Sequence, residues 1–239
     1  MKGKLVLPKE HGSWVMCIMP SLLGVFLSSP NVLHIPFLIG WFFLYLSATP
    51  LLAIIRNRKN TNRMLPWLLS YSGVAMVCFI PILIVIPKLI LFPVSMIPLL
   101  AINIYYIRKK NERSLLNDLS GISIFSVAGV ASYYIGNGSL TTEAIQLFVI
   151  TTLYFFGSAF YIKSMIREFK NKTFHRVSHL FHGFLLLVVF FDWILLIAFL
   201  PSILKDWITP RRKRIKPIHL GILEIGLSIW FFIICLVAF

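Results

Sequence analysis

The sequence predicts an all-α, polytopic transmembrane helical bundle of nine helices whose amino end is cytoplasmic. Apolar stretches of about 20 residues recur from Trp14 to Phe239, and such a stretch is long enough to cross a bilayer as a helix. Hydrophobic residues make up 58% of the chain and charged residues only 13%, which is unlike a soluble domain. Nearly every Lys and Arg falls in a break between apolar stretches, and short basic loops mark the cytoplasmic side. We therefore expect one transmembrane domain over residues 1–239.

The apolar runs give seven spans directly. They cover residues 14–27, 33–55, 67–86, 89–107, 117–135, 143–164 and 217–239. With a cytoplasmic amino end, alternation places the breaks 56–63, 108–113 and 163–176 inside and the breaks 28–32, 86–88 and 136–142 outside. Only Lys88 is basic among the outer breaks, so the charge pattern and the alternation agree.

The stretch 177–208 decides the number of crossings. As a single helix it places the basic cluster 211–216 on the outer face, which contradicts the charge pattern of the other loops. Two short helices, about 176–190 and 193–208 with a turn near Asp192, return that cluster to the cytoplasm. Each is roughly 23 Å long at 1.5 Å per residue, so the bilayer must be thinner there. We favour nine crossings, with eight as the alternative.

The net charge of +15 raises the question of nucleic acid, which requires a basic face on a soluble fold. Here the bases are dispersed over short loops beside apolar spans. Each such Lys or Arg contributes about 1 kcal/mol of attraction to anionic lipids. The charge pattern therefore predicts membrane lipids as partners and no nucleic acid.

Glu224 is the strongest candidate functional residue, because it lies inside the final span, where a carboxylate is costly. One interpretation is a structural ion pair with Lys216, Arg167 or another interior base. The other is a role in binding or in proton handling.

Three histidines, His175, His179 and His182, share one face of a helix because their spacings are four and three. Such a stripe suits contacts with backbone carbonyls or lipid headgroups, binding of an anion, or ligation of a metal or haem. No metal-binding motif accompanies the histidines, so the signal for a metal is weak and we assign no metal ligand. The sequence does not decide whether a metal or haem binds.

Polar residues also gather where other spans meet the cytoplasmic side. Asn117 and Asp118 begin the fifth span, where either could act as a helix cap. Basic side chains near a span end suit a phosphate or diphosphate headgroup. We expect Glu224 and His11 to be acid–base candidates. The expected substrate contacts are Glu10, Asn117, Asp118, Lys163, Arg167 and His179.

Four segments carry a family resemblance: PKEHGSW (8–14), ERSLLNDLSG (112–121), FGSAFYIKSMIRE (156–168) and KPIHLGILE (216–224). They resemble the YwiC-like family of bacterial integral membrane proteins, over the full length of the chain. The layout of that family is in turn similar to UbiA-type intramembrane prenyltransferases. The resemblance implies a multi-pass protein of the bacterial cytoplasmic membrane with a lipid-accessible cavity that faces the cytoplasm.

The UbiA-type enzymes hold a prenyl diphosphate through Mg²⁺ on Asp-rich motifs after the second and sixth helices. This chain has IRNRKNTNR (55–63) at the first place, without a carboxylate, and REFKNKTFH (167–175) at the second, with Glu168 alone. Mg²⁺ prefers carboxylate oxygens. We therefore do not expect Mg²⁺, and the sequence leaves the cofactor open.

Our leading hypothesis is that the protein binds or processes an amphiphilic anionic substrate in a cavity open to the cytoplasmic leaflet. An isoprenoid phosphate, a lipid or a tetrapyrrole fits this description. The first alternative is a small-solute or proton-coupled transporter, in which Glu224 and the histidines are the coupling sites. The second alternative is a non-catalytic membrane assembly factor. The sequence does not decide whether the protein is an enzyme.

Overall fold

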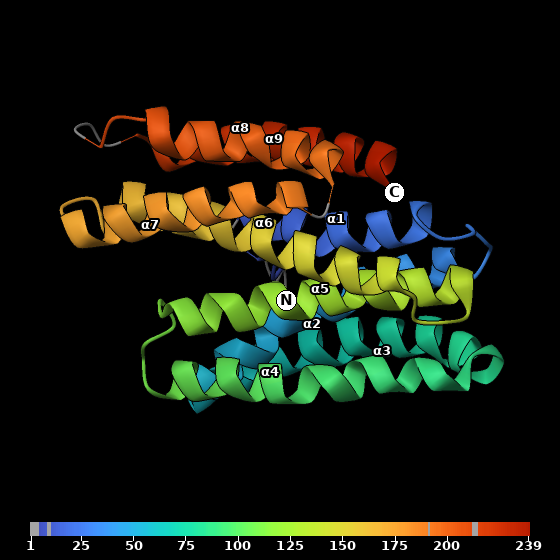
Figure 1. Cartoon of the computed structure of the whole chain (residues 1–239). Helices are drawn as coiled ribbons and strands as arrows, with labels where there is room; N and C mark the ends of the chain where they lie inside the picture. Colours follow the sequence, from blue (N-terminus) through green and yellow to red (C-terminus); the bar gives the residue numbers. More distant parts are fainter. Residues whose placement is uncertain (1–4, 9–10, 191, 212–214) are drawn as a thin grey trace. The chain divides into compact units, whose positions relative to one another are not determined.

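The computed structural model describes residues 5–8, 11–190, 192–211 and 215–239. Within these residues the chain is all-α, with nine α-helices and no strand (Figure 1). The helices are α1 (His11–Phe26), α2 (His34–Arg56), α3 (Thr61–Val85), α4 (Leu91–Arg108), α5 (Leu115–Asn137), α6 (Thr142–Ile166), α7 (Lys172–Phe184), α8 (Trp193–Ile208) and α9 (Pro217–Ala238). Three short 3₁₀ segments join them: η1 (Arg58–Asn60), η2 (Pro87–Ile90) and η3 (Leu185–Phe190).

Seven helical segments of the described chain are long and apolar enough to cross a membrane. The protein is therefore a multi-pass membrane protein, as the sequence predicts. The helices α1 and α8 have 16 residues each, roughly 24 Å at 1.5 Å per residue, which is shorter than a typical hydrocarbon core. Nine crossings and a cytoplasmic amino end stay predictions.

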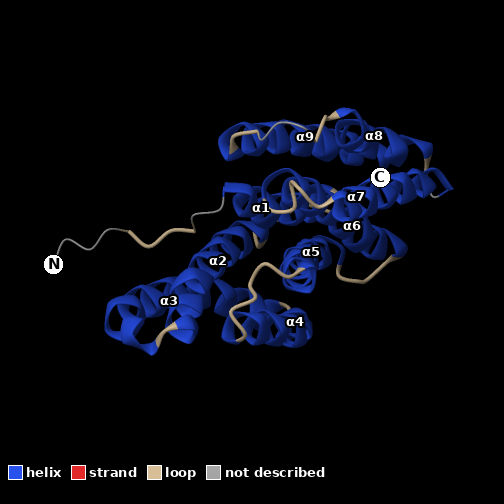
Figure 2. Cartoon of the chain, turned by 90° about the vertical axis from the view of Figure 1, so that its left-hand side faces the viewer, coloured by secondary structure: helices blue, strands red, loops and turns tan. Residues whose placement is uncertain are grey.

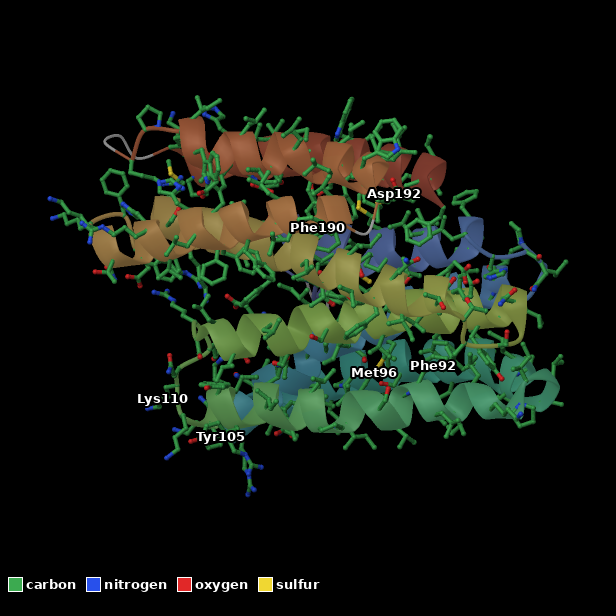
Figure 3. The ribbon with its side chains drawn as sticks, viewed as in Figure 1. Phe92, Met96, Tyr105, Lys110, Phe190 and Asp192 are labelled. Atoms are coloured by element: carbon green, nitrogen blue, oxygen red, sulfur yellow. The ribbon has the colours of Figure 1, made fainter. Side chains whose placement is uncertain are left out.

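The stretch 177–208 forms two helices. The first, α7 with η3, ends at Phe190, and α8 begins at Trp193 (Figure 3). Asp192 has an extended backbone and caps α8, since its carboxylate accepts a hydrogen bond from the Ile194 amide at 2.7 Å. The helices α7 and α8 pack against each other. The predicted hairpin near Asp192 is thus confirmed, and the single long helix is wrong.

The chain divides into two compact units, residues 1–148 and 149–239, and α6 begins in the first and continues into the second. The single domain predicted over residues 1–239 stays a prediction. In the first unit α2 packs on α3, while α1 and α4 pack on α5 (Figure 2). Its core includes Trp41 and Tyr45, and the Trp41 indole donates a hydrogen bond to the Cys17 carbonyl at 3.0 Å.

Close backbone contact joins α1 to α5. A Cβ atom on Gly24 would lie 2.1 Å from the Gly129 carbonyl oxygen, and one on Gly129 would lie 2.7 Å from the Pro20 carbonyl oxygen. Small residues allow helix backbones to approach in membranes, where van der Waals packing rather than water drives association. These two glycines therefore fix the distance between α1 and α5.

Aromatic side chains form the core of the second unit. Tyr154 of α6 stacks on Phe231 of α9 with ring centroids 3.9 Å apart and meets the edge of Phe199 of α8 at 6.0 Å. Phe160 of α6 lies 5.0 Å from Phe181 of α7. The helices α8 and α9 run side by side (Figure 1). The rings thus tie α6 to the other three helices of this unit.

The hairpin generates a topology prediction. A fluorescent protein fused after Phe239 should be dark and an alkaline phosphatase there active, because nine crossings from a cytoplasmic amino end place residue 239 outside. The same reporters fused after Arg211 should give the reverse result. A fluorescent fusion after Phe239 would contradict the nine-crossing count.

The α1–α5 contact generates a stability prediction. Gly24→Ala should destabilise the protein by about 1–3 kcal/mol, because the added methyl group overpacks a backbone contact. Gly73→Ala in α3 is the matched control, since a Cβ there meets nothing within 4 Å. Thermal unfolding in detergent measures both variants, and equal melting temperatures would refute the assigned role of Gly24.

Candidate functional site

A buried ion pair joins α8 to α9. The Lys205 ammonium lies 2.5 Å from Glu224 Oε1, and the two side chains expose only 5% and 6% of their surface. Ser158 of α6 donates its hydroxyl hydrogen to Glu224 Oε2 at 2.7 Å. Both oxygens of the Glu224 carboxylate are therefore engaged by donors from neighbouring helices.

The carboxylate of Asp206, the next residue of α8, is fully buried and gathers its own donors. Ser178 Oγ donates to Asp206 Oδ1 at 2.7 Å, and His179 Nδ1 lies 2.5 Å from Oδ2. The Arg211 guanidinium, just after α8, forms an ion pair with Oδ1. His182 Nδ1 lies 3.6 Å from Oδ2. Asp206 thus connects α8 to α7 and to the loop that follows α8.

Tyr161 of α6 lies between the two ion pairs. The Lys205 ammonium is 4.3 Å from the centroid of its ring, and the Arg211 guanidinium is 5.0 Å from it. An aromatic face stabilises a desolvated cation. The Tyr161 hydroxyl donates to Thr209 Oγ1 at 3.2 Å. We call Lys205, Asp206, Arg211 and Glu224 the α8 charge cluster, and its formal charges cancel.

Two polar nitrogen atoms beside this cluster have no hydrogen-bond partner in the described protein. They are His182 Nε2 and Arg211 Nε. A buried polar atom without a partner costs about 1–3 kcal/mol, so most such atoms in proteins are satisfied. Of these two atoms, His182 Nε2 can take a proton, whereas the Arg211 Nε–H group can only donate a hydrogen bond to a water molecule or a ligand.

Two of the predicted site residues, His179 and Glu224, belong to this arrangement. The partner of Glu224 is Lys205 rather than Lys216 or Arg167, the two bases named from the sequence. Lys163 is buried in α6, while Arg167 is exposed just after α6 ends.

Other predicted residues lie elsewhere. Glu10 is outside the described residues, and only the backbone of His11 is described, as the first residue of α1. Asn117 and Asp118 lie in the first unit, inside the first turn of α5, whose N-cap is Ser114. The prediction that Asn117 or Asp118 caps the helix is therefore wrong. The Asn117 amide instead donates to the Glu112 carbonyl at 2.7 Å.

Lys205, Asp206 and Ser158 were not predicted as site residues. Lys205 and Asp206 form a charged dipeptide inside the apolar run 193–208, and a charge within a span is a functional candidate. This charged dipeptide was visible in the sequence, but residues 193–208 were interpreted only for the number of membrane crossings. Ser158 carried no signal, because a serine in a membrane helix needs no charged partner.

A groove of about 540 Å³ lies between α4 and α5 in the first unit. Its walls are almost wholly apolar, with Ser120 and Ser123 as the polar contributions. The lining residues are Leu99, Ala101, Ile102, Tyr105, Tyr106, Leu116, Leu119, Ser120 and Ser123.

The turn between α4 and α5 borders this groove with positive charge (Figure 3). The Lys109 ammonium lies 5.9 Å from the centroid of Tyr105, one of the lining rings. Lys110 adopts a left-handed backbone with φ of 55°. The backbone N–H of Asn111 donates a hydrogen bond to the Tyr106 carbonyl at 2.9 Å. This Schellman arrangement fixes the turn. Arg56 forms an ion pair with Glu112, with Nε 2.7 Å from Oε1, which neutralises the carboxylate of the turn.

The described residues contain no group of three or more His, Cys, Asp or Glu side chains arranged to hold a metal ion. In the two loops compared with the Asp-rich motifs, Arg58–Asn60 forms a 3₁₀ turn and Glu168 Oε2 accepts a hydrogen bond from Asn171 at 2.8 Å.

The buried ion pair generates a stability prediction. Lys205→Met and Glu224→Gln should each destabilise the protein by about 3–5 kcal/mol, since each leaves a buried charge without its partner. The double variant should lose less free energy of unfolding than the two single variants lose together. Thermal unfolding with size-exclusion detection measures the cycle.

The control is Arg56→Gln, which removes the ion pair with Glu112. The side chains of Arg56 and Glu112 are 55% and 35% exposed. An exposed pair contributes about 0–1 kcal/mol, so this change should have little effect. Equal losses from the exposed and the buried pair, or additive losses in the cycle, would show that Lys205 and Glu224 are not coupled.

The comparisons with known proteins agree with one another. The family model described as "YwiC-like protein" matches residues 7–133. An uncharacterized protein YwiC of Bacillus subtilis is 40% identical over 239 residues, covering 98% of each chain. An uncharacterized protein of Haemophilus influenzae is 36% identical over 237 residues, covering 98% of this chain and 99% of that one. No solved structure matches, so the likeness to UbiA-type prenyltransferases stays a prediction. The chain belongs to the YwiC-like family of proteins.

Proposed function

We propose that this protein binds an amphiphilic anionic molecule from the cytoplasmic leaflet of the bacterial cytoplasmic membrane. The apolar chain of the ligand lies in the α4–α5 groove, and its charged head meets the basic turn that follows α4. The observation that carries the proposal is this juxtaposition of an apolar groove with exposed bases at one end of the same helix pair.

The groove suits the apolar part of such a ligand. Its volume of about 540 Å³ falls within the range of small-molecule sites in proteins, about 300–1,000 Å³. Leu99, Ile102, Leu116 and Leu119 supply aliphatic contacts, and the tyrosine rings supply flat ones. An acyl or isoprenoid chain, or the edge of a tetrapyrrole, matches these walls because it demands no hydrogen bonds from them.

The turn suits the charged part. Arg108, Lys109 and Lys110 are exposed, and Glu112 is already paired with Arg56. Each such base attracts an anionic group near the membrane surface by about 1 kcal/mol. Beyond the turn, Asn117 Oδ1 is buried without a partner, so it offers an acceptor to a hydroxyl or amide of the head. Asn117 thus stays the proposed polar contact on this unit, and Asp118 stays a prediction from the sequence.

The proposal is one of binding rather than catalysis. Donors occupy both oxygens of Glu224, so a proton transfer at this group first requires the ion pair with Lys205 to open. An acid–base role for Glu224 with His11 therefore does not enter the proposal.

The test is native mass spectrometry of the protein released from nanodiscs, with three anionic probes: phosphatidylglycerol, farnesyl diphosphate and haem. Phosphatidylcholine is the neutral comparison. We expect one anionic probe to bind one-to-one and in preference to phosphatidylcholine. Ala101→Trp should abolish this binding, because the indole fills the groove. Replacing Lys109 with Gln should weaken it about fivefold, as expected for the loss of about 1 kcal/mol.

Ile84→Trp is the matched control, because Ile84 is a 75% exposed residue of α3 outside the groove. It should bind the probe as the wild type does. The proposal fails if no anionic probe binds better than phosphatidylcholine, or if Ala101→Trp and Ile84→Trp bind equally.

A further inference from the structure

His182 of α7 is a fully buried imidazole with one bonded and one unbonded nitrogen atom. Its Nδ1 lies 2.8 Å from the backbone carbonyl oxygen of Ser178, one helical turn earlier. A carbonyl only accepts, so Nδ1 carries the hydrogen of the neutral ring. The lone pair therefore resides on Nε2, which has no partner among the described residues.

The surroundings of His182 are polar on one side and tightly packed on the other. A Cβ atom on Gly157 of α6 would lie 3.3 Å from Nε2, so α6 approaches the ring closely. The charged and titratable groups gathered in this part of the unit include Lys163 and Tyr161 of α6, His179 of α7, Lys205 and Asp206 of α8, Arg211 of the following loop and Glu224 of α9.

Asp206 provides a counter-ion for a charged form of this ring. Its Oδ2 lies 3.6 Å from His182 Nδ1 and 2.5 Å from His179 Nδ1, so two imidazoles share one carboxylate oxygen. A buried cation requires a partner of opposite charge, which an imidazolium at His182 has. His179 exposes 38% of its side chain, so the same carboxylate connects the buried ring to the surface of the unit.

We propose that His182 is a proton-binding site, in which Nε2 takes one proton from a hydronium ion and releases water. The resulting imidazolium keeps its hydrogen bond to Ser178 and forms an ion pair with Asp206. It then shares that carboxylate with Arg211, and the formal charge of the ring and the α8 charge cluster together changes from zero to plus one. This inference is independent of the ligand groove, because every residue in it belongs to the second unit.

The test is ¹⁵N NMR of histidine-labelled protein in nanodiscs, because imidazole nitrogen shifts distinguish both neutral tautomers and the imidazolium. The chain has six histidines, and the signal lost in His182→Gln identifies His182. We expect the Nδ1–H tautomer with a bare Nε2 at alkaline pH and the imidazolium on acidification. The Nε2–H tautomer, or a ring that stays neutral until the protein unfolds, would overturn the proposal.

Two further variants separate proton binding from a structural role. In Asp206→Asn the imidazolium should be lost over the pH range in which the wild type forms it, since the counter-ion is gone. Gly157→Ala places a methyl group against Nε2 and should likewise suppress the protonated form, whereas Gly221→Ala meets open space and should not. If a folded Asp206→Asn or Gly157→Ala variant titrates as the wild type does, the assigned site is wrong.

Discussion

The charges of α8 must be compensated within an apolar helical unit, and this requirement orders the packing of α6 to α9. Removing an ion from water costs several kcal/mol, which only close partners offset. Lys205 therefore faces Glu224 and Tyr161, while Asp206 faces donors from α7 and the following loop. Because the two residues are adjacent in sequence, one helix satisfies opposite charges in two directions. The rotation of α8 is fixed as a result.

The first unit differs, because none of its described Lys, Arg, Asp and Glu residues is buried. Its buried polar groups reach backbone carbonyls, as His34 Nε2 does with the Ser132 carbonyl at 3.0 Å, and its glycines bring α1 against α5. The pair α4–α5 then leaves an open apolar groove beside exposed bases. A groove of this kind needs no internal ion pair, since its specificity comes from the contrast between an apolar wall and a charged rim. The two units therefore offer distinct chemistry.

The fold could be predicted closely because charge placement is a local signal. The basic loops bounded the spans to within a few residues, and Asp192 marked the hairpin because an aspartate favours a helix start. The candidate site could be predicted only in part. The histidine stripe and Glu224 stood out as costly residues, but periodicity shows which face a residue occupies and not which neighbour it meets. The ion pair between Glu224 and Lys205 joins α9 to α8, and the groove depends on the distance between α4 and α5. Each feature involves two helices, so the sequence of one helix alone does not reveal it.

Formal neutrality gives the α8 charge cluster a specific property. With His182 neutral, the two cations and two carboxylates of this cluster cancel, so the cluster has no net attraction for an anion. One added proton gives the ring and the cluster together a net charge of plus one, because Asp206 is then shared by Arg211 and the imidazolium, and a net charge acts strongly in a medium of low dielectric constant. Binding of a proton and of an anion to this cluster must then favour each other to the same degree, because linkage is reciprocal. A ligand held only by the groove of the first unit has no such dependence, so the response of ligand binding to the His182→Gln variant separates a passive lipid binder from a proton-linked one.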